Sequence, residues 1–468
     1  MVHFALGLFL SYAAFFQQSL DSLIASVDNE KALELSVLVK KLDGEVLFQH
    51  QAQRPLVLAS NTKLFTTAAA LLEMGADYKW HTTAYLHGND LAIVGGGDPS
   101  MTMLDDSDLA QQFIIELLQK LRAAQISKLD NLYIDGSSFT EQRHKLWPLE
   151  HQWDYFCAPP TSLSVNGGCI SIDFDGSAAS FYPNVSKSLS VAHYGKPSES
   201  LSAWWADNGE TLWLRTPPGK QQTAVYAVPD GLQFFSWWIR DEFKAAGLDV
   251  GQVIIAPKPN WENSSLLLDY SSALSLQEVV YQINKESNNF MAEVVLKSLA
   301  VMRGVEGSYL KGVASVNAVL AEHDFELTDF EQLDGSGMAR SNTINNSASP
   351  ETICEVLERM AFEPAGEVWF SSLAVGGVDG TLKNRFTDQS FQPQRVHAKT
   401  GFIHSKQSVD GFGASSLSGY LLLPDNEIAV FAFVVNFKRK INKNTNNRRF
   451  KSLQQQFLKQ LLDEYRNE

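Results

Sequence analysis

The chain contains 468 residues, of which 44% are hydrophobic and 19% are charged. This composition excludes wholesale disorder, and the length is enough for a large buried core in more than one domain. The formal net charge of −15 and the pI of about 5.2 disfavour partners with a negatively charged surface, namely nucleic acid and anionic lipid.

The N-terminal sequence MVHFALGLFLSYAAFFQQ resembles a secretory signal. Its apolar run from Val2 to Phe16 carries no charge and contains small residues near its end. No basic residue precedes Lys31, so the usual basic start of such a signal is missing, and a buried N-terminal helix is the alternative. No later segment reaches the ~18 uninterrupted apolar residues that a membrane-spanning helix needs. We therefore expect residues 1–20 to be a signal peptide and the exported protein to have no membrane span.

The cysteines leave two readings open. If the chain is exported, Cys157 and Cys169 are close enough in sequence to form a disulfide. Three unpaired thiols, with Cys354 as the third, are equally consistent with the pattern. No group of Cys and His residues has the spacing of a zinc site.

The first half of the chain begins with a hairpin and a helix. Apolar alternation on both sides of Asp43-Gly44 predicts two paired strands within residues 33–57. The alanine-rich segment that follows predicts a helix that ends near Gly75. Short strands are expected over 80–94 and an amphipathic helix over 109–124. Residues 129–253 are expected to form mostly short strands and turns.

The second half returns to helices and ends in strands and a last helix. Helical patterns cover residues 275–299, 308–323 and 350–360. Strand patterns follow in RVHAKTGFI, SLSGYLLL and EIAVFAFVVNF, and the C-terminal segment from residue 448 predicts an amphipathic helix. This order predicts one α+β domain that is interrupted by insertions.

Ser60 and Lys63 are the first candidate catalytic pair. On a helix, residues i and i+3 share one face, so the lysine amine can approach the serine hydroxyl and take its proton. The spacing is weak evidence by itself, because Ser308 and Lys311 have it too and we expect those to be inert. Small apolar residues after Lys63 predict a buried helix, where a lysine needs a partner or a shifted pKa. A helix cap at Ser60 is the alternative.

Two further motifs are candidates for the same site. Ser287 and Asn289 precede an apolar helix, where a hydroxyl can shuttle protons and an amide can bind a substrate carbonyl, although a helix cap explains them as well. Lys399, Thr400 and Gly401 lie in a strand-like run. A lysine and a hydroxyl can bind a carboxylate there, and a glycine lets backbone and substrate come close. A strand with a bulge is the alternative.

Together, Ser-x-x-Lys, Ser-x-Asn and Lys-Thr-Gly occur in the order found in penicillin-binding proteins and serine β-lactamases, which the chain resembles. The long insertion between the first two motifs is typical of class C low-molecular-mass penicillin-binding proteins, the D-alanyl-D-alanine carboxypeptidase/endopeptidase family. The segments GGGDPS, CAPPTSLSVNGGC, SNNFMAEVVLK, LDGSGMARSN and AVGGVDGTLKNRF are also similar to that family.

The resemblance implies a role for each motif residue. Ser60 is expected to be the acylated nucleophile, Lys63 its general base, and Ser287 the proton relay to the leaving D-alanine. Substrate binding is expected from Asn289, Lys399, Thr400 and Gly401, and the backbone N–H groups of Ser60 and Phe402 are expected to form the oxyanion hole. The resemblance implies peptidoglycan peptides and β-lactam antibiotics as partners, a periplasmic location, and no metal or organic cofactor.

Three features depart from the family pattern. Phe402 stands where the family usually has a small polar residue, and the segment from Phe402 to Ser416 is longer than usual. The acidic residue that the family places near the diaminopimelyl amine of the substrate is not clearly aligned, and we take Asp154 and Phe156 as candidates for that position. GGGDPS and the Gly-rich segment from Asp334 to Gly337 are interpreted as turns, because the first lacks the Gly-Lys-Ser/Thr ending of a phosphate loop.

The expected fold is therefore an α+β penicillin-binding domain, an antiparallel sheet flanked by helices, with two β-rich insertions. We assign residues 21–85 and 268–468 to the catalytic domain, residues 86–165 and 250–267 to one insertion, and residues 166–249 to the other. The alternatives are a β-lactamase or esterase of the same superfamily and a catalytically silent scaffold that binds peptidoglycan.

Overall fold

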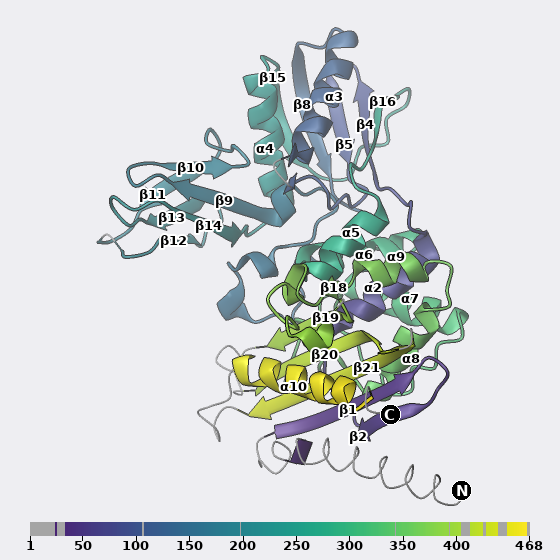
Figure 1. Cartoon of the computed structure of the whole chain (residues 1–468). Coiled ribbons are helices and arrows are strands. Elements are labelled where there is room, and N and C mark those ends of the chain that lie inside the picture. The colour runs from purple at the N-terminus through teal and green to yellow at the C-terminus, as the bar shows by residue number, and fades with distance from the viewer. Residues whose placement is uncertain are drawn as a thin grey trace, which may run out of the picture. The chain divides into compact units, whose positions relative to one another are not determined.

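The computed structural model describes residues 24–25, 33–104, 107–196, 198–341, 343–392, 394–403, 412–424, 427–438 and 447–465. The predicted signal peptide and residues 404–411 of the Phe402 to Ser416 segment lie outside the described residues. The chain forms two compact units, each of which is taken by itself below (Figure 1). Unit 1 comprises Met1–Leu72, Val280–Ser287 and Val316–Glu468, and unit 2 comprises Glu73–Val279 and Asn288–Ser315. The predicted boundaries of a catalytic domain and two insertions stay a prediction.

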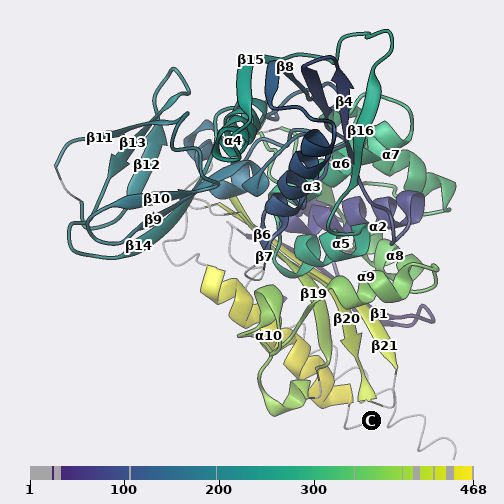
Figure 2. The same ribbon diagram turned by 90° about the horizontal axis from the view of Figure 1, so that it is seen from above.

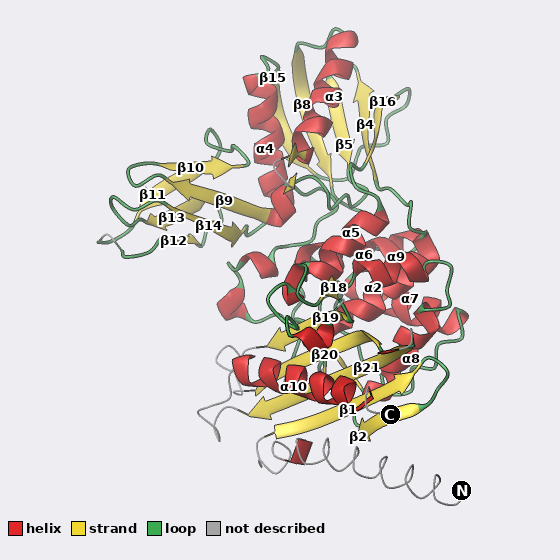
Figure 3. Ribbon diagram, viewed as in Figure 1, coloured by secondary structure: helices red, strands yellow, loops and turns green. Residues whose placement is uncertain are grey.

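Unit 1 is built on a six-stranded antiparallel sheet in the order β18-β19-β20-β21-β1-β2. Its strands are β1 (Leu33–Lys41), β2 (Val46–His50), β18 (Ala374–Val375), β19 (Val396–Ile403), β20 (Phe412–Leu422) and β21 (Ile428–Lys438). The predicted hairpin is confirmed, with Gly44 at a φ of 94° in the turn between β1 and β2. Strands from the two ends of the chain therefore lie side by side, since β1 pairs with β21 (Figure 3).

Helices cover both faces of this sheet. Successive residues of β1 face opposite sides. Val37 and Val39 belong to a core shared with the apolar face of α10 (Asn447–Tyr465), which lies along the sheet in Figure 1. Lys40, on the other side, forms an ion pair with Glu358 of α8 (Pro350–Met360). The expected antiparallel sheet flanked by helices is present.

The remaining elements of unit 1 include those that carry the motifs. They are β3 (Leu56–Val57), the 3-10 turn η1 (Ala59–Asn61), α2 (Thr62–Met74), α5 (Leu276–Lys285), α7 (Tyr309–Glu322) and α9 (Gly366–Ser372), of which α2, α5 and α7 extend across the boundary between the units. Gly75 follows α2 with a φ of 80°, a conformation that glycine adopts without strain, and it ends the helix as expected.

Unit 2 contains a mixed five-stranded sheet and two three-stranded sheets. The larger sheet has the order β15-β8-β5-β4-β16, and the smaller ones have the orders β10-β9-β14 and β11-β13-β12. The strands are β4 (His81–His87), β5 (Asp90–Val94), β8 (Lys128–Asp135), β9 (Cys169–Phe174), β10 (Ala179–Tyr182), β11 (Ser190–His193), β12 (Ser202–Trp205), β13 (Thr211–Arg215), β14 (Gln222–Ala227), β15 (Asp249–Ile255) and β16 (Ser265–Ser271). The helices α3 (Leu109–Ala123), α4 (Gly231–Ala245) and α6 (Asn289–Met302) complete the unit (Figure 2).

One expectation for the helices was wrong, and one helix was not expected. Residues 275–299 do not form one helix, because Ser287 adopts a φ of 63° and the side chain of Asn288 caps α6 by accepting the N–H of Met291. The stretch 129–253 contains α4, a full-length helix, in addition to strands and turns. Asp230 caps α4 by accepting the N–H of Gln233 at 2.9 Å, and the helix buries an aromatic face.

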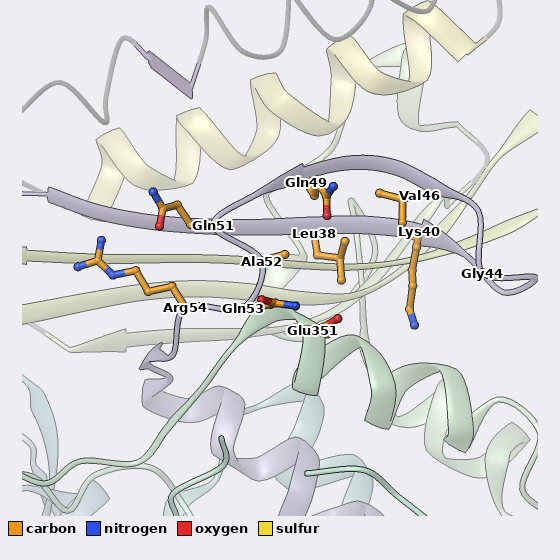
Figure 4. A pocket seen from close by; sticks show the side chains of 10 residues that line it. All are labelled: Leu38, Lys40, Gly44, Val46, Gln49, Gln51, Ala52, Gln53, Arg54 and Glu351. Carbon is orange, nitrogen blue, oxygen red and sulfur yellow. The ribbon is translucent and has the colours of Figure 1, made fainter. Parts of the chain in front are cut away.

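Cys157 and Cys169 are both buried and are not joined in a disulfide. Among the described residues, no helix has the length and apolar character to span a membrane. A cavity of about 900 Å³ lies at the β2 edge of the sheet and is drawn in Figure 4. Lys40, Gln49, Gln51, Arg54 and Glu351 are among its lining residues, and it contains none of the predicted site residues.

Candidate active site

The Ser-x-x-Lys motif forms a direct contact between its two polar side chains. Lys63 Nζ donates a hydrogen bond to Ser60 Oγ at 3.1 Å. Ser60 lies in η1, directly after Ala59, which has a φ of 50°, and before the first turn of α2. Lys63 is fully buried, whereas Ser60 is partly exposed. The serine hydroxyl is therefore open to a ligand while the amine beside it is shielded from water.

A glycine-containing turn holds the amine of Lys63. Lys63 Nζ donates a second hydrogen bond to the carbonyl of Ser336 at 2.9 Å. The Asp334 carboxylate fixes this turn by accepting the backbone N–H of Gly337 at 2.8 Å and that of Ala339 at 2.6 Å. Gly337 has a φ of 85°, and a Cβ there would lie 1.9 Å from the carbonyl oxygen of Ala59. The segment is a turn, as interpreted from the sequence, and it positions the lysine of the first motif.

The second and third motifs meet in a contact of the same kind. Lys399 Nζ donates to Ser287 Oγ at 2.9 Å and to the carbonyl of Thr400 at 3.0 Å. Lys399 is fully buried and Ser287 is partly exposed. Burial lowers the pKa of Lys399 well below its ordinary value, and the positive charge of Lys63 lowers the pKa further. The two lysines are thus close enough to act on each other electrostatically.

The left-handed backbone of Ser287 is held by the segment that precedes it. Lys285 Nζ lies 2.6 Å from the Asp379 carboxylate and also donates to the carbonyl of Leu373 at 2.9 Å. Gly380 lies against Lys285, since a Cβ there would be 2.6 Å from the Lys285 carbonyl oxygen. The segment from Leu373 to Gly380 therefore fixes the loop between α5 and α6 in the conformation that presents Ser287.

Gly401 brings β19 next to the first motif. A Cβ at this position would lie 2.2 Å from Ser416 Oγ, 2.6 Å from the Leu58 carbonyl oxygen and 3.0 Å from Ser60 N. Real side chains do not fit at such distances, so a glycine is required for this approach. The backbone of β19 at Gly401 consequently lies next to the backbone N–H of Ser60. The oxyanion hole expected from the N–H groups of Ser60 and Phe402 stays a prediction.

Thr400 has a partner that the sequence did not indicate. Its hydroxyl donates to Thr381 Oγ1 at 3.0 Å. Thr381 belongs to the turn that begins at Asp379, so one short segment contacts both the Ser287 loop and Thr400. The Asp379-Gly380 pair in the sequence is a signal for a turn but not for this contact.

The remaining predicted residues lie together in unit 2. Asn289 Nδ2 donates to the carbonyl of Phe156 at 3.0 Å. Asp154 precedes Phe156 by two residues, is partly exposed, and contacts His151 Nδ1 at 2.5 Å. The predicted residues thus form two groups. The contact between Asn289 and Phe156 lies within unit 2. Unit 1 contains the contacts of Ser60, Lys63, Ser287, Lys399, Thr400 and Gly401. Among the described side chains, no group of three His, Cys, Asp or Glu residues is arranged to hold a metal ion.

Residues 16–456 match the model of the D-Ala-D-Ala carboxypeptidase 3 (S13) family. The chain belongs to this family. Among curated proteins, it is 26% identical to a D-alanyl-D-alanine carboxypeptidase of Actinomadura sp., over 90% of this chain and 80% of the relative. Among solved structures, penicillin-binding protein 4 of Haemophilus influenzae aligns with a TM-score of 0.78 and 20% identity, over 95% of this chain and 98% of that one. A penicillin G-acylated predatory endopeptidase of Bdellovibrio bacteriovorus aligns with a TM-score of 0.54 and 16% identity, over 92% and 93% of the two chains.

Proposed function

We propose that this serine carboxypeptidase hydrolyses the D-alanyl-D-alanine bond of peptidoglycan stem peptides, and D-alanyl-diaminopimelate cross-links, through an acyl-enzyme on Ser60. The observation that carries the proposal is the 3.1 Å contact between Ser60 Oγ and the fully buried amine of Lys63. A hydroxyl next to a shielded amine is the arrangement that nucleophilic catalysis by serine needs. The names of the Actinomadura and Haemophilus relatives agree with this activity.

The acylation step follows from the two hydrogen-bonded pairs. In the reactive state the Lys63 amine is uncharged and takes the hydroxyl proton of Ser60 as Oγ attacks the carbonyl carbon of the penultimate D-alanine. The N–H groups of Ser60 and Phe402 stabilise the resulting oxyanion. The C–N bond then breaks, and the proton that Lys63 took from Ser60 passes through the hydroxyl of Ser287 to the leaving amine, which restores the uncharged Lys63 amine.

Lys399 and Thr400 bind the carboxylate of the leaving residue in this proposal. Bringing an anion next to Lys399 favours its charged form and offsets the lowering of its pKa by burial and by Lys63. Water then hydrolyses the ester on Ser60 and regenerates the free hydroxyl. A β-lactam would acylate Ser60 in the same way, and the penicillin G-acylated Bdellovibrio endopeptidase, a protein of similar fold, supports this.

The sequence motifs indicate further substrate contacts in this proposal. Asn289 binds the substrate amide, and the partly exposed carboxylate of Asp154, with Phe156 beside it, binds the amine of the diaminopimelyl side chain. The apolar, uncharged N-terminal sequence supports export to the periplasm, where wall peptides are found.

The nucleophile is tested by the substitution Ser60→Ala, with Ser308→Ala as the matched control. Both serines begin a Ser-x-x-Lys sequence, but only Ser60 contacts its lysine amine. Intact-protein mass spectrometry after incubation with penicillin should show a stable adduct on the wild type and on Ser308→Ala, and none on Ser60→Ala. An adduct on Ser60→Ala would disprove the assignment.

The same measurements separate the alternatives. An adduct on the wild type that disappears within seconds would favour a β-lactamase or esterase. A wild-type protein that forms no adduct and releases no D-alanine from a pentapeptide would favour a silent scaffold.

A further inference from the structure

A cavity of about 270 Å³ lies beside the Lys-Thr-Gly strand within unit 1. Thr400, Gly401 and Phe402 line one side of it, and Ser415 and Ser416 of β20 adjoin them. The other side is formed by Thr381, Arg385, Asn447, Lys451 and Gln454, the last three from α10. None of these lining residues is acidic. Among the described residues, the cavity is therefore lined by two cations and no carboxylate, in a chain whose net charge is −15.

Arg385 is the buried cation of this cavity. Its side chain donates to the carbonyl of Lys451 at 3.2 Å and to Gln454 Oε1 at 3.0 Å, and the residue is only 8% exposed. Within the described part of the chain, Arg385 Nε has no hydrogen-bond partner. Burial lowers the pKa of Arg385 to about 10, so the guanidinium stays charged at neutral pH. A buried guanidinium that has no carboxylate beside it carries a positive charge that nothing neutralises.

Lys451 and Gln454 add a second positive charge and a further hydrogen-bond donor to this cavity. Burial, together with the positive charge of Arg385, lowers the pKa of Lys451, so the two cations repel each other. Gln454 is 1% exposed, and its amide Nε2 has no hydrogen-bond acceptor among the residues that the structure describes. An anion in the cavity would relieve the repulsion and accept hydrogen bonds from donors that have none.

The position of the cavity decides which anion suits it. It shares Thr400 and Gly401 with the place where the carboxylate next to the scissile bond is held, so it lies on the leaving-group side. A leaving D-alanine has a single carboxylate, and Lys399 with Thr400 would take it. The leaving group of a cross-link is a peptide, and it carries carboxylates beyond the one next to the scissile bond.

We propose that this cavity is a subsite for a second carboxylate of the leaving peptide, held by Arg385 and Lys451. The inference rests on the proposed function and extends it by naming the substrate class. Cross-linked peptides with an anionic leaving strand should be preferred over substrates that release a neutral or single-carboxylate group. The subsite binds through charge, so the preference for an anionic leaving strand should become smaller as ionic strength rises.

The test compares two synthetic D-alanyl-diaminopimelate dimers. In one, the remote carboxylates of the leaving peptide are free, and in the other they are amidated, while the carboxylate next to the scissile bond is free in both. For the wild type, kcat/KM should be about three- to tenfold higher for the free acid, the size expected for a partly exposed charge pair. Lys451→Glu should abolish or invert this preference, and Lys451→Gln should reduce it. Circular dichroism would show that the variants are folded.

Lys120→Glu is the matched control, because it makes the same charge change at an exposed lysine of another helix, α3, and lines neither this cavity nor the neighbouring one that contains Arg385 and Lys451. It should keep the wild-type preference. Equal rates for the two dimers in the wild type, or an unchanged preference in Lys451→Glu, would overturn the inference. A wild type that releases D-alanine from a pentapeptide but cleaves neither dimer would overturn it too, with the proposed function intact. Failure of every substrate and of penicillin labelling would instead reject the proposed function.

Discussion

The chain contains two Ser-x-x-Lys sequences whose structures differ. In the first, Lys63 Nζ contacts Ser60 Oγ at 3.1 Å, and the lysine is fully buried. In the second, Ser308 Oγ accepts the backbone N–H of Lys311 at 3.3 Å, and the lysine side chain is exposed. The second serine is therefore a helix cap at the start of α7. The environment of the lysine, and not the spacing, separates a nucleophile from a cap.

Local backbone and burial explain the difference. Ser60 lies in a 3-10 turn before α2, and every residue of α2 from Thr62 to Leu71 is buried. The amine of Lys63 cannot reach water there, so it bonds to the hydroxyl and to a carbonyl. The amine of Lys311 is solvated on the outside of α7 and gains nothing from a contact with Ser308.

Substituting the two lysines should produce the largest contrast. Lys63→Met removes the group that takes the Ser60 proton, so acylation by a fluorescent penicillin should slow by about 10²–10⁴-fold. Lys311→Met should leave the rate within about twofold, since surface substitutions of this kind have small effects. Both rates can be measured by gel fluorescence over time. A Lys63→Met protein that is labelled at nearly the wild-type rate would remove Lys63 from its role as base.

Lys297 extends the comparison, because it is buried but bonds to no hydroxyl group among the residues that the structure describes. Its amine donates to the carbonyls of Thr140 at 2.7 Å, Glu141 at 2.6 Å and Pro160 at 3.3 Å, and it lies 4.4 Å from the centre of the Tyr309 ring. These hydrogen bonds connect α6 to two loops of unit 2. Burial of a lysine is therefore necessary for the proposed chemistry, but a neighbouring hydroxyl is needed as well.

Lys297→Met should consequently reduce stability and spare acylation. The three carbonyls lose a charged donor, which should lower the free energy of unfolding by about 1–3 kcal/mol, as measured by urea denaturation. The rate of penicillin labelling of the folded protein should stay within about twofold. A large loss of acylation without a loss of stability would contradict this structural role.

The pH dependence of stability provides a second check on Lys297. Burial lowers its pKa to about 8, against the opposing influence of the Glu293 and Glu141 carboxylates. Between pH 8 and the ordinary value of 10.5, the unfolded chain binds more protons at this group, so its contribution to stability increases with pH over that window and is lost as pH falls through 8. Lys297→Met should lack this slope. Equal slopes in the two proteins would mean that the lysine stays charged when folded.

The local features of unit 1 were predictable from sequence. Asp43-Gly44 identifies a hairpin because the turn residues and the flanking alternation agree, and the alanine-rich segment after Lys63 predicts a buried helix for the same reason. The helix α4 was not predicted because aromatic residues favour strands when only the residue type, and not the spacing, is considered. Its capping Asp230 and the helical spacing of the buried aromatic residues were the available signals.

The motif residues of the site were predictable, but their supports were not. Lys63 and Lys399 could be named because the order of three motifs is informative. The carbonyl of Ser336 comes next to Lys63, and the hydroxyl of Thr381 next to Thr400, only through tertiary packing. The same holds for Arg385, which lines a cavity with Thr400. A backbone carbonyl carries no residue signature, and a threonine in a turn resembles many others. Such partners can be identified only from the folded structure, in which strand pairing brings distant segments together.

The smallest expected effect tests one of these supports. Thr381→Val keeps the shape of the side chain but removes the hydroxyl that accepts the hydrogen bond of Thr400. Thr400 can then rotate away from the position in which it would bind a carboxylate. Loss of one neutral hydrogen bond costs about 0.5–1 kcal/mol, so KM for D-alanine release should rise about two- to fivefold with little change in kcat.

Thr387→Val, an exposed position a few residues further along, is the matched control and should leave KM unchanged. A pentapeptide whose terminal carboxylate is amidated should be hydrolysed slowly and at the same rate by the wild type and by Thr381→Val, because Thr400 then has no anion to hold. If Thr381→Val slowed both substrates equally, Thr381 would support the fold of the turn and not the orientation of Thr400. This outcome would also weaken the link that the segment from Asp379 to Thr381 makes between Ser287 and the Lys-Thr-Gly strand.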